Sequence, residues 1–295
     1  LALIQIFVYH PLFSQLGISY QMSKHTDLLG GRMKDYEDRE TGRRFLPYIP
    51  VYARIDGRGF SKFTRDAVKP FDPHISAAMI AATTKLVETT RATIGYTQSD
   101  EISLVWTTRE PGEDMFFNGK VQKMCSVLAG LATAAFMHSL LDSESDWTDR
   151  LKRLPHFDAR VAQLPNREEA ANMILWREMD ARKNAISMAA HAHFSHKSLH
   201  GLSGRDKLAK MAEAGIDFDA YPVAFRRGTF IRRSVISAPM PEDVRLSIPE
   251  KSRPEIGAVI TRSMVKNVDM PQFNHVTNRA DVVFDGAAPI EATLV

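Results

Sequence analysis

Residues 49–56 read Ile-Pro-Val-Tyr-Ala-Arg-Ile-Asp, and apolar side chains alternate with polar ones along most of this stretch. A period of two residues is typical of a strand with one buried face. The stretch therefore predicts a half-buried strand that ends at Asp56. A glycine-containing turn follows at 57–60. Asp72 and Pro73 then begin a predicted helix, because aspartate accepts from free helical amides and proline suits the first turn.

The rest of the chain supplies the other elements of a small mixed fold. Apolar periodicity predicts, in order, a strand pair at 93–106, a helix at 117–140, a strand at 156–163, a helix at 167–196 and a strand at 228–236. Strand–helix–strand–strand–helix–strand is the split βαβ, or ferredoxin-like, order. The predicted fold class is therefore α+β, with an antiparallel sheet and helices packed on one face.

The composition narrows the class of protein. The 295 residues are 44% apolar and 25% charged, which excludes a wholly disordered or collagen-like chain. One cysteine, Cys125, excludes an intrachain disulfide and a cysteine-based zinc site, so we expect a reducing, cytoplasmic location. The net charge of +3 permits a nucleic-acid partner without requiring one. We expect no segment long and apolar enough to cross a membrane.

Two aspartates are expected to meet at one edge of the sheet. Asp56 ends the first strand and Asp100 lies in the turn of the hairpin, and the split βαβ order makes these strands neighbours. Two carboxylates with an adjacent glycine carbonyl are a minimal holder for two Mg²⁺ ions about 4 Å apart, as phosphoryl-transfer enzymes use. Aspartate is also common in turns for local reasons. The pattern alone leaves both interpretations open.

The residues next to Asp56 favour the metal site. Gly57 and Gly59 let the backbone approach a triphosphate closely and direct its amides toward it. Lys69, held by Pro70, can reach back as a counter-charge for phosphate. A glycine pair alone is weak evidence, but its position directly after a metal-type aspartate strengthens it.

Three stretches together resemble a known superfamily. Residues 56–63 (DGRGFSKF), Lys69-Pro70 and residues 95–103 (GYTQSDEIS) closely resemble the tRNA-His guanylyltransferases, which are reverse, 3′-to-5′, nucleotide polymerases. The resemblance covers about residues 45–235 and implies a polymerase-palm-like fold and a homo-tetramer, a dimer of dimers. It divides the chain into an N-terminal extension that need not be native, a palm-like catalytic domain and a proline-punctuated C-terminal segment, at 1–40, 41–238 and 239–295.

The resemblance also implies a role for each matching residue. Asp56, Asp100 and the Gly57 carbonyl would hold two Mg²⁺ ions, and Glu101 would support these catalytic groups. ATP and GTP would be the substrates beside tRNA. The residues implied to bind nucleotides are Gly57, Arg58, Gly59, Phe60, Lys69, Ser99, Lys120, Lys123 and Asn184.

Lys120 and Lys123 match the basic pair that holds the activating nucleotide's triphosphate in the family. Lysines three residues apart share one helical face, and the free amides of a first turn favour phosphate. A solvated polar face is the alternative. The combination with Asp56 and Asp100 favours the nucleotide contact.

Basic residues beyond the catalytic motifs suggest an RNA contact. Arg226, Arg227 and Arg232 resemble the family's basic strand entry and are predicted to attract an RNA backbone. A charged edge strand is the alternative. Four histidines within residues 191–200 lack the H-E-x-x-H spacing and any cysteine. A helix-end cluster that contacts RNA or is solvated is therefore favoured over zinc.

The chain departs from the eukaryotic enzymes at residues 182–188. They carry H-I-N-N-L-Y-N, whereas this stretch reads RKNAISM and keeps only Asn184. The following HAHFSHKSLHG resembles bacterial and phage guanylyltransferase-like proteins, which are associated with template-dependent repair of tRNA 5′ ends. We therefore expect a nucleotidyltransferase that adds a nucleotide, preferentially guanylate, to the 5′ end of tRNA-His or of a damaged tRNA. The alternatives are a nucleotide cyclase of the same fold and a non-catalytic RNA-binding split βαβ module.

Overall fold

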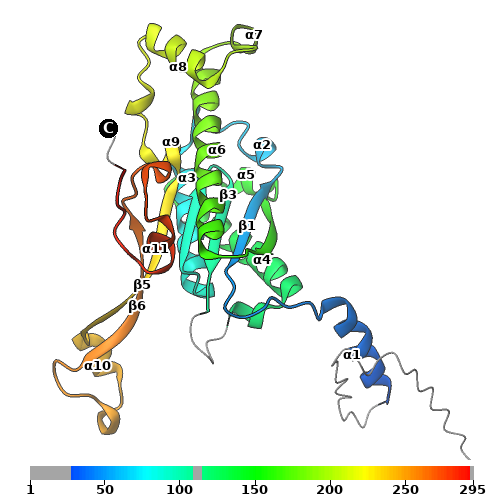
Figure 1. The fold of residues 1–295 in the computed structure, drawn as a ribbon, viewed down its shortest axis with the longest axis vertical. Helices are drawn as coiled ribbons and strands as arrows, with labels where there is room; N and C mark the ends of the chain where they lie inside the picture. Colours follow the sequence, from blue (N-terminus) through cyan, green and yellow to red (C-terminus); the bar gives the residue numbers. More distant parts are fainter. Residues whose placement is uncertain (1–27, 109–114, 293–295) are drawn as a thin grey trace, which may run out of the picture. The chain divides into compact units, whose positions relative to one another are not determined.

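The computed structural model describes residues 28–108 and 115–292. The chain forms two compact units, Leu1–Gly42 and Arg43–Val295. The described part of the first unit contains the helix α1 (Leu28–Thr41), in which no residue is buried. The second unit contains every other element and is called the catalytic unit below (Figure 1).

The catalytic unit is built on one antiparallel sheet with the strand order β4-β1-β3-β2-β5-β6. The strands are β1 (Val51–Arg58), β2 (Ile94–Gln98), β3 (Glu101–Trp106), β4 (His156–Gln163), β5 (Thr229–Pro239) and β6 (Val259–Val268). The strands predicted from alternation, β1 to β5, are all present. The predicted α+β class with an antiparallel sheet is confirmed.

One face of the sheet carries the helices expected there. α3 (Pro73–Thr90) and α4 (Val121–Leu141) bury Met79, Leu86, Leu128 and Phe136 against Ile55 and its neighbours in the strands. Asp72 caps α3 as predicted, since its Oδ1 accepts from the amides of His74 and Ile75 at 3.0 and 3.4 Å. The short elements α2 (Phe60–Phe63), η1 (Phe116–Gly119) and α5 (Thr148–Leu151) lie at the edges of this layer.

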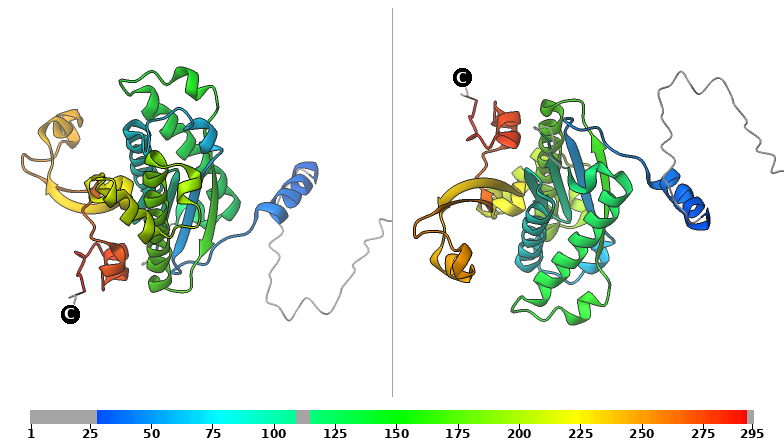
Figure 2. Two further views of the ribbon diagram at one scale, coloured as in Figure 1. Left: turned by 90° about the horizontal axis from the view of Figure 1, so that it is seen from above. Right: turned by 90° about the horizontal axis from the view of Figure 1, so that it is seen from below.

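The other face is also covered, which the sequence did not lead us to expect. α6 (Arg167–His193) crosses it, and the C-terminal elements η4 (Phe273–His275) and α11 (Arg279–Phe284) pack beside it (Figures 1 and 2). The physical reason is that the central strands are apolar on both faces: Tyr52, Tyr96 and Val105 form a second core with these elements. The helices thus flank the sheet on both sides.

The C-terminal half of α6 extends past the sheet and has a core of its own. It packs with α7 (His196–Leu199), α8 (Gly204–Glu213), η2 (Phe218–Ala220) and α9 (Val223–Arg227). The shared core includes Ile186, Leu199, Met211 and Phe225. Residues 182–227 are called the helical lobe below.

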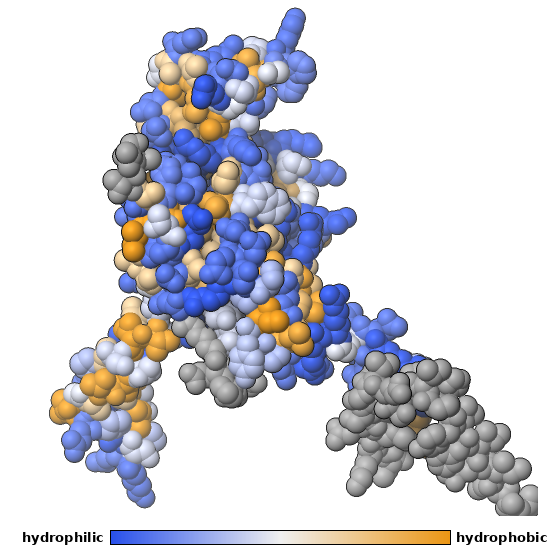
Figure 3. Space-filling view, in the orientation of Figure 1, coloured by the Kyte–Doolittle hydropathy of each residue, from blue (hydrophilic) through white to orange (hydrophobic). Residues whose placement is uncertain are grey.

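A two-stranded arm projects from the far edge of the sheet. β5 and β6 pair over their full lengths, and the arm carries α10 (Glu242–Ser247) and η3 (Glu250–Ser252) at its tip (Figure 1). Exposed apolar side chains, among them Val235, Val259 and Ile256, give this arm several hydrophobic patches (Figure 3). The boundary predicted between the catalytic domain and the C-terminal segment, at residues 238 and 239, falls inside β5. The C-terminal segment contributes β6 to the same sheet.

α4 corrects one expectation from the sequence. Among the helices of the described ranges, it is the one whose length and hydropathy suffice for a membrane span. Five of its residues, from Met124 to Leu140, lie in the core against α3 and the sheet. Core helices of globular domains pass the same length and hydropathy test, so the result is weak evidence for a membrane.

Candidate active site at the β1 end and the β2–β3 turn

The structure brings Asp56 and Asp100 to the same end of the sheet. Asp56 lies near the end of β1, opposite Glu101 in the register of β3, and Asp100 occupies the turn before β3. The Gly57 amide donates to the Asp100 carbonyl oxygen at 2.8 Å, which fixes the turn against β1. The predicted convergence of the two carboxylates is therefore confirmed. Their catalytic role stays a prediction.

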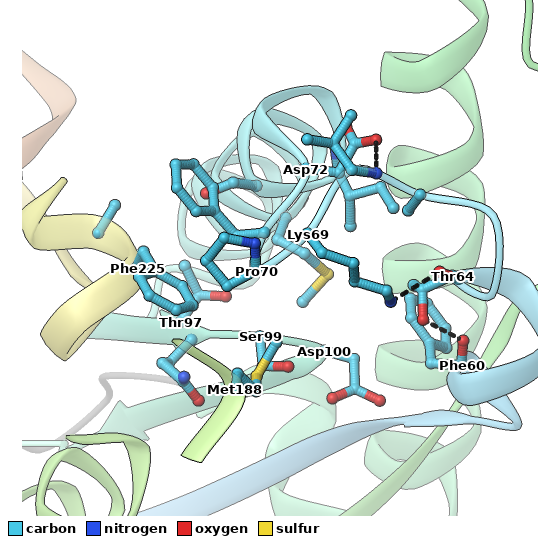
Figure 4. Close-up of a pocket in the computed structure, with 18 of the residues that line it drawn as sticks. Phe60, Thr64, Lys69, Pro70, Asp72, Thr97, Ser99, Asp100, Met188 and Phe225 are labelled. Carbon is cyan, nitrogen blue, oxygen red and sulfur yellow. Dashed lines mark hydrogen bonds between the residues drawn. The ribbon is translucent and has the colours of Figure 1, made fainter. Parts of the chain in front are cut away.

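A pocket of about 310 Å³ opens beside Asp100 (Figure 4). Its polar end is formed by Asp100, Ser99, Lys69 and Ser61. Its other end is apolar. The apolar lining comes from the start of α3, from α6 and from α9, and includes Phe71, Ile75, Met79, Met188 and Phe225. A charged end next to an apolar cleft suits a ligand with a phosphate group and a planar ring.

The pocket places several residues that the resemblance named. Lys69 lies at the pocket edge, and its Nζ donates to the Thr64 carbonyl at 3.2 Å (Figure 4). Ser99 has a left-handed backbone, with φ of 53°, and its side chain bonds to Asp100. Phe60 borders the pocket but is 4% exposed, because its ring packs among Phe63, Phe136 and Phe157.

The remaining turn residues are more open. Arg58 and Gly59 are exposed at the end of β1, and Gly59 has a φ of 70° with no atom within 4 Å of the point that a Cβ would occupy. Asn184 is exposed on α6, one turn before the pocket residue Met188. None of these three residues lines the pocket, so their predicted contact with a nucleotide stays a prediction.

The electrostatics of Asp100 fit a cation site. Burial raises the pKa of the Asp100 carboxyl above its ordinary value, and repulsion from Asp56 raises it further, while hydrogen bonds from the local backbone and Ser99 oppose the shift. The charged form is thus disfavoured unless a positive charge lies next to it. Two carboxylates and a neighbouring glycine carbonyl are hard oxygen ligands of the kind that Mg²⁺ prefers. The residues present therefore fit the ions.

The protein ligands would not complete the coordination by themselves. Within the described ranges, no cluster of three or more His, Cys, Asp or Glu side chains could hold a metal ion. One oxygen of Asp56, Oδ2, already accepts from Arg54 at 2.8 Å. Water and ligand phosphates would have to supply the rest, as is usual for Mg²⁺ bound with a nucleotide.

Glu101 lies behind the aspartates and is held by two arginines. Arg177 of α6 donates to both of its oxygens, at 2.5 and 2.8 Å, and Arg54 Nε lies 2.7 Å from Oε2. Arg54 also forms an ion pair with Asp56, so consecutive ion pairs connect Arg177 of α6 to Asp56. Glu101 is therefore placed to position Arg54 and Asp56 and is not free to act on a substrate.

Sequence reasoning missed Arg177, which is separated from Glu101 by 76 positions. It is 8% exposed, stacks on Trp176 and also contacts Asp180 at 3.1 Å. The signal that could have found it is the Trp-Arg-Glu-Met-Asp stretch at 176–180, a charged run that directly follows the apolar residues 173–175 in the middle of a helix. Charges in such a place need partners elsewhere in the fold.

Replacing Arg177 with methionine is expected to lower the free energy of unfolding by about 3 kcal/mol, because a half-buried Glu101 loses one of its two cations. Denaturant unfolding measures the loss. The matched control is Lys85→Met, which breaks the exposed Lys85–Glu88 pair and is expected to change stability by less than about 1 kcal/mol. Equal effects of the two substitutions would contradict the structural role of Arg177.

Lys120 and Lys123 do not lie at this pocket. Lys120 forms an isolated β-bridge with Arg44. Two residues after Arg44, the Leu46 amide donates to the side chain of Gln163, which lies opposite Val51 in the register of β4 and β1. Val51 is five residues before Asp56, about 17 Å along the strand. The two lysines instead line a separate pocket with Arg44 and Phe117. Their predicted contact with the triphosphate of an activating nucleotide stays a prediction.

The three arginines predicted to contact RNA have different surroundings. Arg226 pairs with Asp219 at 2.7 Å. Arg227 pairs with the buried Glu178 at 3.4 Å and donates to the Met270 carbonyl. Arg232 is 9% exposed and donates to the carbonyls of Val282 and Gly286 at the end of α11. A guanidinium buried in this way holds the C-terminal segment and is not available to an RNA backbone, which corrects the expectation for Arg232.

This geometry defines a class of enzyme: an α+β protein with a palm-like antiparallel sheet and two neighbouring carboxylates, one of which lines a nucleotide-sized pocket. Comparison with known proteins gives the family. Residues 30–165 match the family described as tRNAHis guanylyltransferase. The chain belongs to the tRNA-His guanylyltransferase superfamily and is a nucleotidyltransferase.

Solved structures of bacterial proteins are similar over most of the chain. A bacterial tRNA(His) guanylyltransferase-like protein in complex with ATP is 36% identical in sequence, with a TM-score of 0.62. The match covers 70% of this chain and 87% of the bacterial chain. A complex of a bacterial guanylyltransferase-like protein with GTP is 29% identical, with a TM-score of 0.64 over 84% and 94% of the two chains. The Schizosaccharomyces pombe tRNA(His) guanylyltransferase is 26% identical over 75% of this chain and 87% of its own.

Proposed function

We propose that the protein adds a nucleotide, preferentially guanylate from GTP, to the 5′ end of a tRNA in the 3′-to-5′ direction. The observation that carries the proposal is that Asp100 lines a pocket together with Lys69 and Ser99, while Asp56 lies close to Asp100 on the neighbouring strand β1. Support also comes from the names of similar proteins, which include tRNA(His) guanylyltransferases and ATP- and GTP-bound structures.

In this proposal a 5′ monophosphate of the RNA first attacks the α-phosphorus of ATP, forms an adenylylated 5′ end and releases pyrophosphate. The 3′-hydroxyl of the incoming nucleotide then attacks the activated 5′ phosphorus and expels AMP. A new phosphodiester bond forms, and the hydroxyl proton leaves to solvent. No covalent enzyme intermediate is required.

Residues in the pocket and beside it have parts in this reaction. Asp56, the Gly57 carbonyl and Asp100 would hold two Mg²⁺ ions, which supply charge neutralisation and lower the pKa of the attacking hydroxyl when bound. Lys69 offsets charge on the phosphates, and Ser99 donates a hydrogen bond from its hydroxyl to Asp100 and so orients that carboxylate beside the phosphates. Arg54, held by Glu101, keeps one oxygen of Asp56 fixed. The apolar half of the pocket holds the nucleotide base.

The tRNA and the assembly are also part of the proposal. Either tRNA-His or a tRNA with a damaged 5′ end fits the site, and the residues 182–188 that differ from the eukaryotic motif favour templated repair. The exposed apolar side chains of the β5–β6 arm support a homo-tetramer, in which they would be covered. The single cysteine fits a cytoplasmic location.

The alternatives predict different surfaces. An RNA-binding split βαβ module would need exposed aromatic side chains on its sheet. The strand residues Tyr52, Tyr96, Trp106 and Phe230 are all at most 3% exposed. A nucleotide cyclase shares the carboxylate pair and needs no RNA, so only the product distinguishes it.

Incubation with labelled GTP, ATP and Mg²⁺ tests the proposal. With a tRNA lacking its first 5′ nucleotide, we expect a product one nucleotide longer, and sequencing should place the addition at the 5′ end. Full-length tRNA-His offered in parallel identifies the preferred substrate. A cyclic or dinucleotide product formed without RNA would identify a cyclase, and no incorporation with any tRNA would overturn the proposal.

A further inference from the structure

The charge of the chain is concentrated in the helical lobe. Residues 182–227 contain eight Lys and Arg and four Asp and Glu. The rest of the chain contains 30 Lys and Arg and 31 Asp and Glu. The lobe therefore carries the whole net positive charge of the protein. It begins at Arg182, whose guanidinium lies over the ring of Phe218 in the lobe's own core.

Many of these cations are not used in ion pairs. Arg226 and Arg227 pair with Asp219 and Glu178. Elsewhere in the lobe, Lys207 and Lys210 donate only to neutral oxygens, those of Ser187 and Ser198. Across the described ranges, no carboxylate lies within ion-pair distance of Lys183, Lys197 or Arg205. These cations outside ion pairs leave the lobe with a net positive charge that attracts anions.

Three histidines of the lobe form a row of neighbouring rings, of which the first two are stacked and the third is tilted. The rings of His191 and His196 have centroids 5.7 Å apart and planes inclined at 23°. His196 and His200 are 6.3 Å apart and inclined at 37°. All three side chains are exposed. No hydrogen bond or acidic partner to these rings occurs among the residues that the structure describes, and no metal-binding cluster of three or more His, Cys, Asp or Glu occurs there.

The row begins at the mouth of the catalytic pocket. Met188 lines that pocket and is 38% exposed (Figure 4). His191 follows one turn later on the same helix, so the two side chains are neighbours. The row then passes from α6 to α7, on the end of the catalytic unit where hydrophilic side chains project (Figure 3). Lys183 and Ser187 precede His191 on α6 at intervals of four residues, so they lie on the same helical face. Lys207 donates to Ser187 and therefore also lies beside the row.

We propose that His191, His196 and His200, flanked by the unpaired cations of the lobe, bind single-stranded RNA that leaves the catalytic pocket. The inference rests on the proposed function and identifies the part of the RNA that this surface takes. Unpaired bases expose flat faces that stack on aromatic side chains, histidine included, whereas bases in a duplex do not. A tRNA carries its unpaired 3′ nucleotides directly beside its 5′ end. Stacking tolerates any base, and the cations hold the backbone.

Binding of two RNA hairpins to the full chain, measured by fluorescence anisotropy without nucleotides, tests this inference. One hairpin has an unpaired four-nucleotide 3′ tail and the other is blunt. The double variant His191→Ala/His196→Ala is expected to bind the tailed hairpin at least about tenfold more weakly and the blunt one unchanged. Equal binding of the tailed hairpin by the variant and the unaltered protein would overturn the inference, as would equal weakening for both hairpins.

His193 supplies a matched control on the same helix. It lies outside the row and bonds to the Tyr221 hydroxyl at 3.0 Å, so His193→Ala should leave the affinity for both hairpins unchanged. His191→Phe/His196→Phe keeps the flat rings and should retain the affinity for the tail within about threefold. A phenylalanine variant as weak as the alanine variant would contradict stacking. Melting curves confirm that each variant is folded.

The proposed function can fail separately from this inference. If the unaltered protein extends no tRNA but its binding to the tailed hairpin depends on the histidines, the surface stands and the reaction is wrong. If it extends tRNA and the histidine variants bind and react unchanged, the reaction stands and the surface is wrong.

Discussion

Asp100→Asn is expected to reduce nucleotide addition by at least about a thousandfold, because the site loses one of the two carboxylates that would hold the catalytic cations. Asparagine keeps the size of the side chain and can still accept from Ser99. Single-turnover incorporation of labelled GTP into a tRNA lacking its 5′ nucleotide measures the loss. Binding of the tailed hairpin should not change, because Asp100 is not part of the histidine row that is proposed to bind the tail.

The same substitution should raise thermal stability when no divalent cation is present. The pKa of Asp100 is raised in the folded protein, so the ionised carboxyl is less favourable there than in the unfolded chain. Folding stability attributable to this group therefore falls as the pH rises from the ordinary aspartate pKa to the raised one, and the cost is fully present above the raised pKa. Asparagine removes it. A lower melting temperature for Asp100→Asn in EDTA at pH 7 would contradict this account.

Gly57→Ala is the second substitution with a large expected effect. A Cβ at Gly57 would lie 2.5 Å from Cδ2 of Phe60 and 2.8 Å from Cβ of Asp100. Phe60 cannot move away, because its ring packs against three buried aromatic rings. The turn that carries Asp100 must therefore shift. A displacement of about 1 Å at a reacting centre can cost about a hundredfold in rate, and we expect at least that loss in single-turnover incorporation.

Gly257→Ala, in the β5–β6 arm, is the control for Gly57→Ala. Gly257 has a φ of 84°, so alanine there is strained, but no atom lies within 4 Å of its Cβ position. Both variants should lose roughly 1 to 3 kcal/mol of stability, one through crowding and the other through backbone strain. Only Gly57→Ala should lose activity at a temperature where both are folded. Similar activities of the two variants would show that Gly57 does not fix the position of Asp100.

Local patterns predicted the central sheet and the position of the aspartates. The strands β1, β2 and β3 could be predicted because they are short apolar runs bounded by turns, and two strands joined by a short turn pair with each other. The prediction that β1 is half-buried is wrong, since Val51, Tyr52 and Ala53 are all buried. Asp56 and Asp100 lie at the ends of such strands, so their meeting follows from the topology. The helix α3 was predictable for a similar reason, since Asp72 and Pro73 mark its start.

Other features depend on contacts that a linear pattern does not contain. β6 is mostly exposed and lacks an apolar alternation, so only its pairing with β5 reveals it as a strand. Arg177 reaches Glu101 across 76 positions. Lys120 and Lys123 show a further limit: their spacing indicates a shared helical face, but the end of the sheet depends on how α4 is connected. The burial of Arg232 likewise depends on α11, which follows it by about 50 residues.

Binding of Mn²⁺, a spectroscopic substitute for Mg²⁺, in the presence of ATP tests the central claim most directly. Electron paramagnetic resonance on the full chain should show ATP-dependent binding of two ions, and Asp100→Asn and Asp56→Asn should each lose this binding. Lys85→Met, at an exposed pair on α3, should bind as the unaltered protein does. Two ions bound with unchanged affinity after substitution of either aspartate would contradict the assignment of Asp56 and Asp100 as the ligands.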